Sequence, residues 1–167
     1  KMIVLTPYQE DVYAGKICPY CKSETRITTE KEIYGREYKG VVVICCKNFP
    51  VCDSYVGTHK DDSTTLGRLA DKELRQYKHV THNAFDRIWE EKHCTRTEAY
   101  EHMSRSLGID YDYTHIGMFN IKTCKKAISW ANQVYKDLTI EAEKTEELFD
   151  WYRKQKVKEN NFKKNLI

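Results

Sequence analysis

The chain has 167 residues, of which 40% are hydrophobic and 32% charged, and its formal net charge is +3. This length suits one domain or two small ones. No apolar run approaches the roughly 18–20 residues of a membrane span, and the apolar start ends too early, at Thr6-Pro7, for a signal peptide. Basic and acidic residues balance along the chain, which argues against a polybasic arm. Seven cysteines, an odd number, favour reduced thiols and a cytoplasmic location.

The first segment, Met2 to Gly15, contains a short apolar run, a proline and a mixed stretch. We interpret it as a lead-in strand or loop that covers the module after it.

Two close cysteine pairs follow. Cys18-Pro-Tyr-Cys21 is separated by 24 residues from Cys46-Lys-Asn-Phe-Pro-Val-Cys52. Such pairs build a tetrahedral thiolate site for zinc, so we predict one structural Zn²⁺ ion. Four thiolates leave no open position for a catalytic water. With the ion bound, the net charge falls to about +1.

The neighbouring Cys45 is a rival of Cys46 as a ligand. The spacing favours Cys46, and adjacent residues of a strand point to opposite faces, so only one of the two can face the ion. Cys45 then resembles a small buried apolar residue. His59 is an alternative fourth ligand, although four cysteines already complete the shell.

Three β-rich segments surround these pairs. We expect strands at Ile27–Tyr34, Tyr38–Cys45 and Ser54–His59, with a turn at Gly35. A three-stranded antiparallel sheet with both cysteine pairs at one end is a zinc ribbon.

From Leu66 the apolar spacing becomes helical. Thr95-Arg-Thr-Glu98 is a capping box for a helix that Gly108 ends, and Asn120 is an N-cap. We expect helices at about 66–93 (one or two), 95–107, 120–134 and 139–158. The predicted fold is α+β, with an N-terminal three-stranded antiparallel four-cysteine zinc ribbon and a helical region of about four helices. The predicted domains are 1–60 (ribbon with lead-in), 61–136 (helical region) and 137–167 (charged C-terminal helix).

The second cysteine pair, with the Asp-Ser-Tyr55 that follows, resembles the C-terminal zinc ribbons of type IA topoisomerases. That resemblance covers only Cys18 to about Tyr55 and implies single-stranded DNA binding without topoisomerase activity. The longer arrangement is similar to a family of small phage and prophage proteins named for a zinc-finger-containing domain of unknown function. The residues that carry this second resemblance are Cys18–Cys21, Cys46–His59, Leu66–Ala70, His82–Trp89, Glu98–Tyr100 and His115–Phe119.

Aromatic and basic residues lie close to the cysteines in the sequence. Aromatic rings stack on unpaired bases, and cations neutralise phosphates. The predicted nucleic-acid face comprises Tyr20, Lys22, Arg26, Lys47, Phe49 and Tyr55. The competing interpretation is that Phe49 and Tyr55 only cover the small ribbon core.

Other polar clusters are weaker. His79, His82 and His93, near Glu90 and Glu91, would form a second metal or general-base site, but such spacing is common on polar helices. Cys94 and Cys124 fit helix packing. No phosphate loop, nucleophile elbow or carboxylate pair stands out, so we predict that the protein is not an enzyme.

The sequence favours a zinc-stabilised nucleic-acid-binding protein, with single-stranded DNA as the favoured partner, in the cytoplasm of a phage host. The alternative is a protein-interaction module that binds and modulates a host protein complex. Near-neutral charge and the apolar loop His115–Phe119, which docks into the core or onto a partner, favour this alternative. A nuclease is a distant third.

Overall fold

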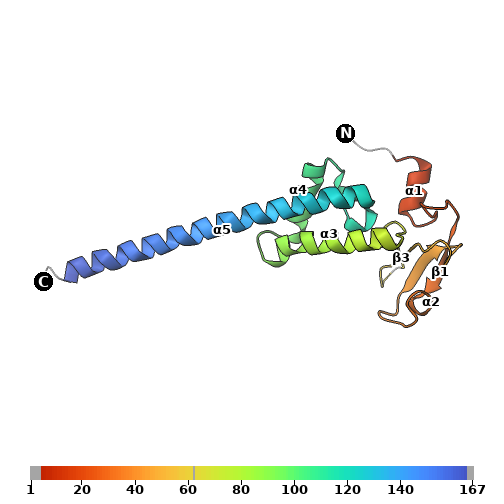
Figure 1. Cartoon of the computed structure of the whole chain (residues 1–167), viewed down its shortest axis with the longest axis horizontal. Coiled ribbons are helices and arrows are strands. Elements are labelled where there is room, and N and C mark those ends of the chain that lie inside the picture. The colour runs from red at the N-terminus through yellow and green to blue at the C-terminus, as the bar shows by residue number, and fades with distance from the viewer. Residues whose placement is uncertain (1–4, 62, 165–167) are drawn as a thin grey trace. The chain divides into compact units, whose positions relative to one another are not determined.

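The computed structural model describes residues 5–61 and 63–164, and it confirms an α+β fold (Figure 1). Contacts divide the chain into two compact units, 1–131 and 132–167. The predicted domain boundaries after residues 60 and 136 stay predictions. The start of the predicted lead-in, Met2–Val4, lies outside the described residues.

Three strands form an antiparallel sheet in the order β1-β2-β3. Ile44 lies opposite Ile27 on one neighbour and Val56 on the other, so these three side chains share one face. On this face Ile44 and Val56 pack with Leu69 and three cysteines in a small core. The strands are β1 (Thr25–Thr29), β2 (Val42–Cys46) and β3 (Tyr55–Gly57).

The predicted strand Ile27–Tyr34 is wrong in its second half, which forms the short helix α2 (Glu30–Tyr34). Thr29 caps this helix by accepting a hydrogen bond from the backbone N–H of Glu32. Gly35 ends it in a left-handed conformation, with φ of 78°. Threonine at the N-cap and glycine after the last turn are standard helix boundaries, so the local capping chemistry outweighs the β-branched composition.

The predicted strand Tyr38–Cys45 is also shorter, since β2 begins at Val42. The backbone N–H groups of Tyr38, Lys39 and Gly40 donate to one carboxylate oxygen of Glu30, at 3.0, 2.9 and 3.0 Å. These three backbone N–H groups therefore bond to a side chain and do not pair with a neighbouring strand.

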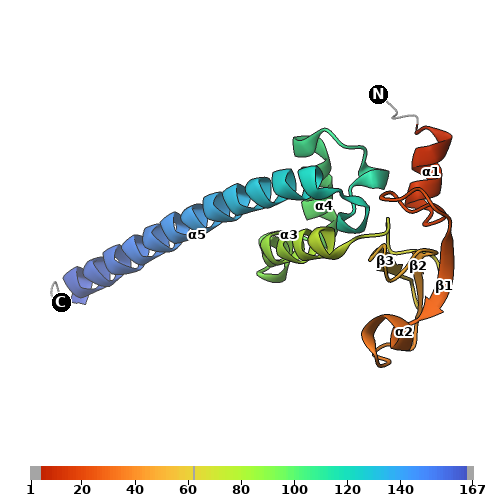
Figure 2. The same cartoon turned by 45° about the vertical axis from the view of Figure 1, so that its right-hand side comes forward.

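The segment before the first cysteine pair forms a helix, α1 (Pro7–Tyr13), instead of the predicted strand or loop. Thr6 and Gln9 make a capping box, with Gln9 N donating to Thr6 Oγ1 and Thr6 N donating to Gln9 Oε1. Proline at the first helical position suits this start. Both views place α1 and α2 toward opposite ends of β1 (Figures 1 and 2).

The helical region begins with α3 (Lys72–Glu90). It starts later than the predicted Leu66, because Asp71 is its N-cap and accepts from the backbone N–H of Leu74 at 2.8 Å. The predicted helix 66–93 is thus a single helix preceded by irregular chain.

The next helix, α4 (Arg96–Leu107), confirms the capping box of Thr95 and Glu98 and the stop at Gly108. Two 3-10 turns follow, η1 (Tyr111–Tyr113) and η2 (Ile116–Met118). The large side chains at the centre of this region are Leu74, Phe85, Ile88, Met103, Ile116 and Phe119. The loop His115–Phe119 therefore docks into the core through Ile116 and Phe119, while His115 is exposed.

The irregular segment Leu66–Ala70 joins the sheet to this core. Tyr55 and Ala70 exchange backbone hydrogen bonds at 3.2 and 3.0 Å. The segment crosses η2 so closely that a Cβ on Gly67 would lie 2.1 Å from the carbonyl oxygen of Gly117. Only glycines allow this contact of two backbones.

The last helix, α5 (Ile121–Lys164), is continuous over 44 residues. Asn120 caps it as predicted, accepting from the backbone N–H of Thr123 at 2.9 Å. The two predicted helices 120–134 and 139–158 are thus one, because the sequence between them contains neither glycine nor proline. Within the first unit, Cys124, Ala127 and Ala131 of α5 are buried. Among the described helices, none is long and apolar enough to cross a membrane.

Candidate metal centre

The first knuckle (residues 18–22) is a tight turn that begins at the buried Cys18. Cys18 N donates to Ser23 O at 2.8 Å, and Lys22 N donates to Cys18 O at 2.9 Å. Lys22 adopts a left-handed conformation, with φ of 61°. This reversal brings Cys21 back beside Cys18.

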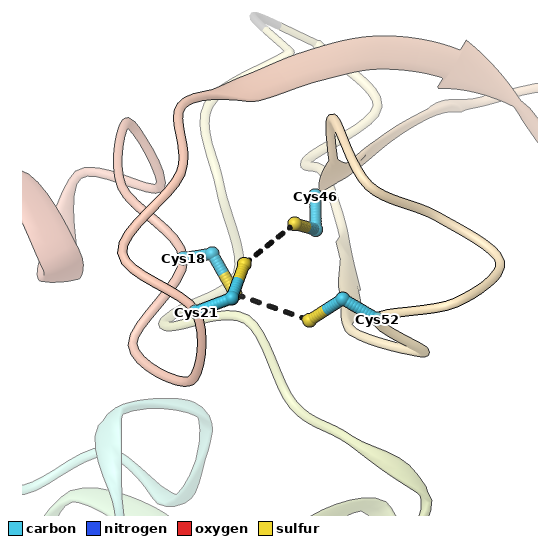
Figure 3. Close-up of side chains that lie close together, drawn as sticks. All are labelled: Cys18, Cys21, Cys46 and Cys52. Atoms are coloured by element: carbon cyan, nitrogen blue, oxygen red, sulfur yellow. Dashed lines mark hydrogen bonds between the residues drawn. The ribbon is translucent and has the colours of Figure 1, made fainter.

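The second knuckle (residues 46–52) begins at the last residue of β2. Phe49 N donates to Cys46 O at 3.0 Å, and Cys52 N donates to Asn48 O at 2.9 Å. The turn therefore folds back on the strand end, and Figure 3 shows its two cysteines facing those of the first knuckle.

The four predicted ligands lie together. Their Sγ atoms are all within 4.8 Å of one another. The sulfurs of Cys18 and Cys52 are 3.6 Å apart, and those of Cys21 and Cys46 are 3.3 Å apart (Figure 3). Zinc–sulfur bonds of about 2.3 Å at tetrahedral angles place sulfurs about 3.8 Å apart. The four thiols therefore fit a zinc ion with little adjustment.

Polar groups around the sulfurs complete the site. Asn48 donates its backbone N–H to the Cys46 sulfur at 3.4 Å and its side-chain amide to the Cys21 sulfur at 3.6 Å. The Ser54 hydroxyl lies 3.1 Å from the Cys18 sulfur. Such partners orient ligands and stabilise thiolate charge. Neither Asn48 nor Ser54 was among the predicted site residues, although an amide two residues after a knuckle's first cysteine is placed to do this.

The thiols differ in acidity. Hydrogen bonds from the side chain and backbone of Ser23 lower the pKa of Cys21 to about 6. Burial raises the pKa of Cys46 to about 12, and burial also raises the pKa of Cys52. A cation is therefore needed to hold all four sulfurs as thiolates, which is the charge that zinc supplies when bound.

The rival ligands lie outside this cluster. Cys45 is buried and lies opposite Arg26 on β1 and Tyr55 on β3, so its side chain is on the other face of β2 from that of Cys46. His59 is exposed and is not part of the cluster.

The structure does not bring the three predicted histidines together, two of which lie on α3 and the third after it. His79 pairs with Asn83 at 3.3 Å, His82 with Asp86 at 3.1 Å, and His93 lies 3.6 Å from Glu91. In the described part of the chain, the four cysteines form the only cluster of three or more metal-ligating residues. The idea of a second metal site is therefore wrong for these histidines.

Ion pairs within the chain neutralise two of the three cations of the predicted nucleic-acid face. The guanidinium of Arg26 bonds to the carboxylate of Glu32, and the ammonium of Lys47 bonds to that of Glu24. Lys22 is exposed and has no ion-pair partner among the residues that the structure describes. Of the three predicted cations, only Lys22 is uncompensated.

The predicted aromatic residues are also engaged to different extents. Tyr55 lies under the guanidinium of Arg75, 4.0 Å from its ring centre, and packs edge-on against Tyr34 and Phe49. Tyr20 is 40% exposed, and its hydroxyl accepts a hydrogen bond from Asp71 N at 3.0 Å. Tyr20 and Lys22 remain together on the first knuckle, while Phe49 and Tyr55 form part of the packing around β3.

Comparison with known proteins identifies one family. The family described as a zinc-finger-containing domain matches residues 14–134, which include all four cysteines and the core of the helical region. No curated protein and no solved structure matches the chain. With the clustered sulfurs, this match establishes a zinc-binding module whose ion is structural. The resemblance of the second knuckle to topoisomerase ribbons stays a prediction.

Proposed function

Because the chain belongs to the family of zinc-finger-containing domains, we propose that its zinc module serves to bind nucleic acid, with single-stranded DNA as the favoured ligand. The zinc ion holds the first knuckle in place and takes no part in chemistry. The proposed activity is binding alone, without catalysis.

The observation that carries this proposal is the exposed pair of an aromatic ring and a cation on the first knuckle. Lys22 is exposed and uncompensated, and it lies two residues from the partly exposed ring of Tyr20. A fixed aromatic ring beside a free cation can stack on an unpaired base while it neutralises the adjacent phosphate. The hydrogen bond from Asp71 holds the Tyr20 ring in one orientation, which reduces the entropy lost on binding.

The test is a salt series of single-stranded oligonucleotide binding, followed by fluorescence anisotropy. Lys22→Met should weaken binding and make the slope of log K against log salt shallower by about 0.7, as for one lost contact to a single strand. Lys47→Met is the matched control, because its cation is already paired with Glu24. Absence of salt-sensitive binding at low salt, or equal losses in the two variants, would overturn the proposal.

The second candidate is the protein-interaction module that binds and modulates a host complex. One observation favours it, a pocket of about 510 Å³ on the α2 side of the sheet. Its rim includes Tyr34, Tyr38 and Leu66, which are 42%, 57% and 48% exposed. Exposed apolar groups around a hollow are typical of docking sites. Pull-down from a host lysate should recover a specific protein that the Tyr38→Ser variant no longer captures; equal capture by both would exclude this pocket.

A further inference from the structure

A second pocket, of about 260 Å³, lies between α1, the first knuckle and the start of α5. Tyr8, Gln9, Tyr13, Arg68 and Asn120 line it, together with a valine and a proline. None of the lining residues is acidic. The pocket therefore has one fixed charge, the guanidinium of Arg68.

Arg68 is held in place by its backbone. Its N–H donates to the carbonyl of Gly117 at 3.2 Å, and its own carbonyl accepts from the ammonium of Lys78 at 3.2 Å. Lys78 also donates to the Gly117 carbonyl at 2.6 Å. The close crossing of Gly67 and Gly117 permits this arrangement, so two family-matched segments meet where Arg68 enters the pocket.

The positive charge here is uncompensated. Among the described residues, neither Arg68 nor Lys78 pairs with a carboxylate, and the buried Nε atom of Arg68 has no hydrogen-bond partner. Burial lowers the pKa of Lys78 to about 8, which still leaves it mostly protonated at neutral pH. Arg68 itself is half-buried and lines the pocket, and a guanidinium without an acidic partner suits an anionic ligand there.

The two amides in the pocket can only donate to a ligand. Gln9 Oε1 already accepts from Thr6, and Asn120 Oδ1 already accepts from Thr123. Their NH₂ groups remain, beside the guanidinium and the tyrosine hydroxyls. A set of donors with one cation suits a ligand that carries several acceptor oxygens and negative charge.

We propose that this pocket binds a phosphate group and, building on the proposed function, that the phosphate belongs to a nucleic-acid strand whose next base reaches Tyr20 on the first knuckle. Pro19 of that knuckle lines the same pocket. The strand would then contact Lys22 and Arg68 with one aromatic ring between the two cations. This arrangement extends the binding surface beyond the ribbon, to α1 and α5.

The first test uses inorganic phosphate and the zinc-loaded full chain. In an NMR titration at constant ionic strength, with chloride as the reference, amides of Tyr8, Arg68 and Asn120 should shift in a saturable way. Because this experiment is done on the unaltered chain, it does not depend on a variant that folds. Shifts that do not saturate, or that appear only at exposed lysines, would overturn the phosphate site.

The second test uses thymidine oligonucleotides with and without a 5′-phosphate. Arg68→Gln should weaken binding about tenfold, as for one lost charge-assisted contact. The exposed Arg105→Gln, which removes the same charge elsewhere, should have little effect. A loss that occurs only with the 5′-phosphorylated strand assigns the pocket to a strand end, and an equal loss with both assigns it to the backbone.

The two proposals fail separately. Saturable phosphate binding without oligonucleotide binding would keep the pocket and refute the nucleic-acid function. Oligonucleotide binding that Arg68→Gln leaves unchanged would refute the pocket as part of the strand's path, and the proposed function of the first knuckle would stand.

Discussion

At the scale of single residues, the choice between Cys45 and Cys46 follows from strand geometry. Cys46 lies on the same face of β2 as Ile44, which is the face that carries the small core. Cys45 points to the other face and is aligned with Arg26 and Tyr55. Spacing and strand alternation predicted this from the sequence. The hydrogen bonds of Asn48 could not be predicted in the same way, because they depend on how the two knuckles meet.

Replacing the two adjacent cysteines separately tests the zinc assignment. Cys46→Ser should reduce bound zinc from one ion per chain to a small fraction, since structural zinc contributes about 10–16 kcal/mol in comparable small sites. Cys45→Ala should keep one ion and lose only packing. Metal analysis of the two purified variants measures this. Full zinc content in Cys46→Ser would contradict the assignment.

Glu30 is a second residue whose role can be measured. Its carboxylate accepts three backbone hydrogen bonds, and the bonds from Tyr38 and Lys39 are the main cause of its lowered pKa. Glu30→Gln should lower Tm by several degrees at pH 7, and the exposed Glu37→Gln should not. Because the folded pKa is depressed, this stabilisation is present above the unfolded value of about 4.3 and is lost as pH falls below it. Identical melting of the two variants at pH 7 would refute this role.

At the scale of elements, capping residues in the sequence predicted helix boundaries where the cap itself determines them. The capping box at Thr95 and the N-cap at Asn120 marked two helix starts correctly. The short helix α1 was missed although Thr6 and Gln9 form an equally good box, because the apolar run before it suggested a strand. The irregular conformation of Leu66–Ala70 was missed because its apolar spacing also fits a helix, and the pairing of Ala70 with Tyr55 is a long-range contact.

The crossing of Leu66–Ala70 with η2 gives a prediction for glycine. A Cβ on Gly117 would lie 2.0 Å from the carbonyl oxygen of Leu66, so Gly117→Ala should destabilise the fold by about 3 kcal/mol or more. Gly108→Ala is the control, since it has positive φ but open space and should cost about 1 kcal/mol. Chemical denaturation of both variants measures the difference. A smaller loss for Gly117→Ala than for Gly108→Ala would show that the two segments separate easily.

At the scale of the whole molecule, the zinc site and the sheet depend on each other. Three of the six residues in the small core beneath the sheet are zinc ligands, so the module has little apolar packing without the ion. The helical region has its own core around Phe85 and Met103. The residues of the predicted nucleic-acid face were chosen because they lie close to the cysteines in the sequence. The ion pairs that two of them, Arg26 and Lys47, form with Glu32 and Glu24 could be seen only in three dimensions.

Removal of zinc should therefore unfold one part of the first unit and spare the other. After treatment with a strong chelator, amides of β1, β2 and β3 should exchange with solvent at nearly the rate of an unfolded chain, while those of α3 and α4 stay protected.

Acid should act in the same direction as chelation. The bound thiolates carry no protons, whereas burial raises the pKa of free Cys46 and Cys52, so falling pH favours the protonated, metal-free form. Hydrogen exchange read by mass spectrometry measures both effects, with metal analysis to confirm zinc loss. Restored protection on adding zinc, but not magnesium, is the control, and a zinc-free chain whose strands stay protected would show that the sheet holds without its metal.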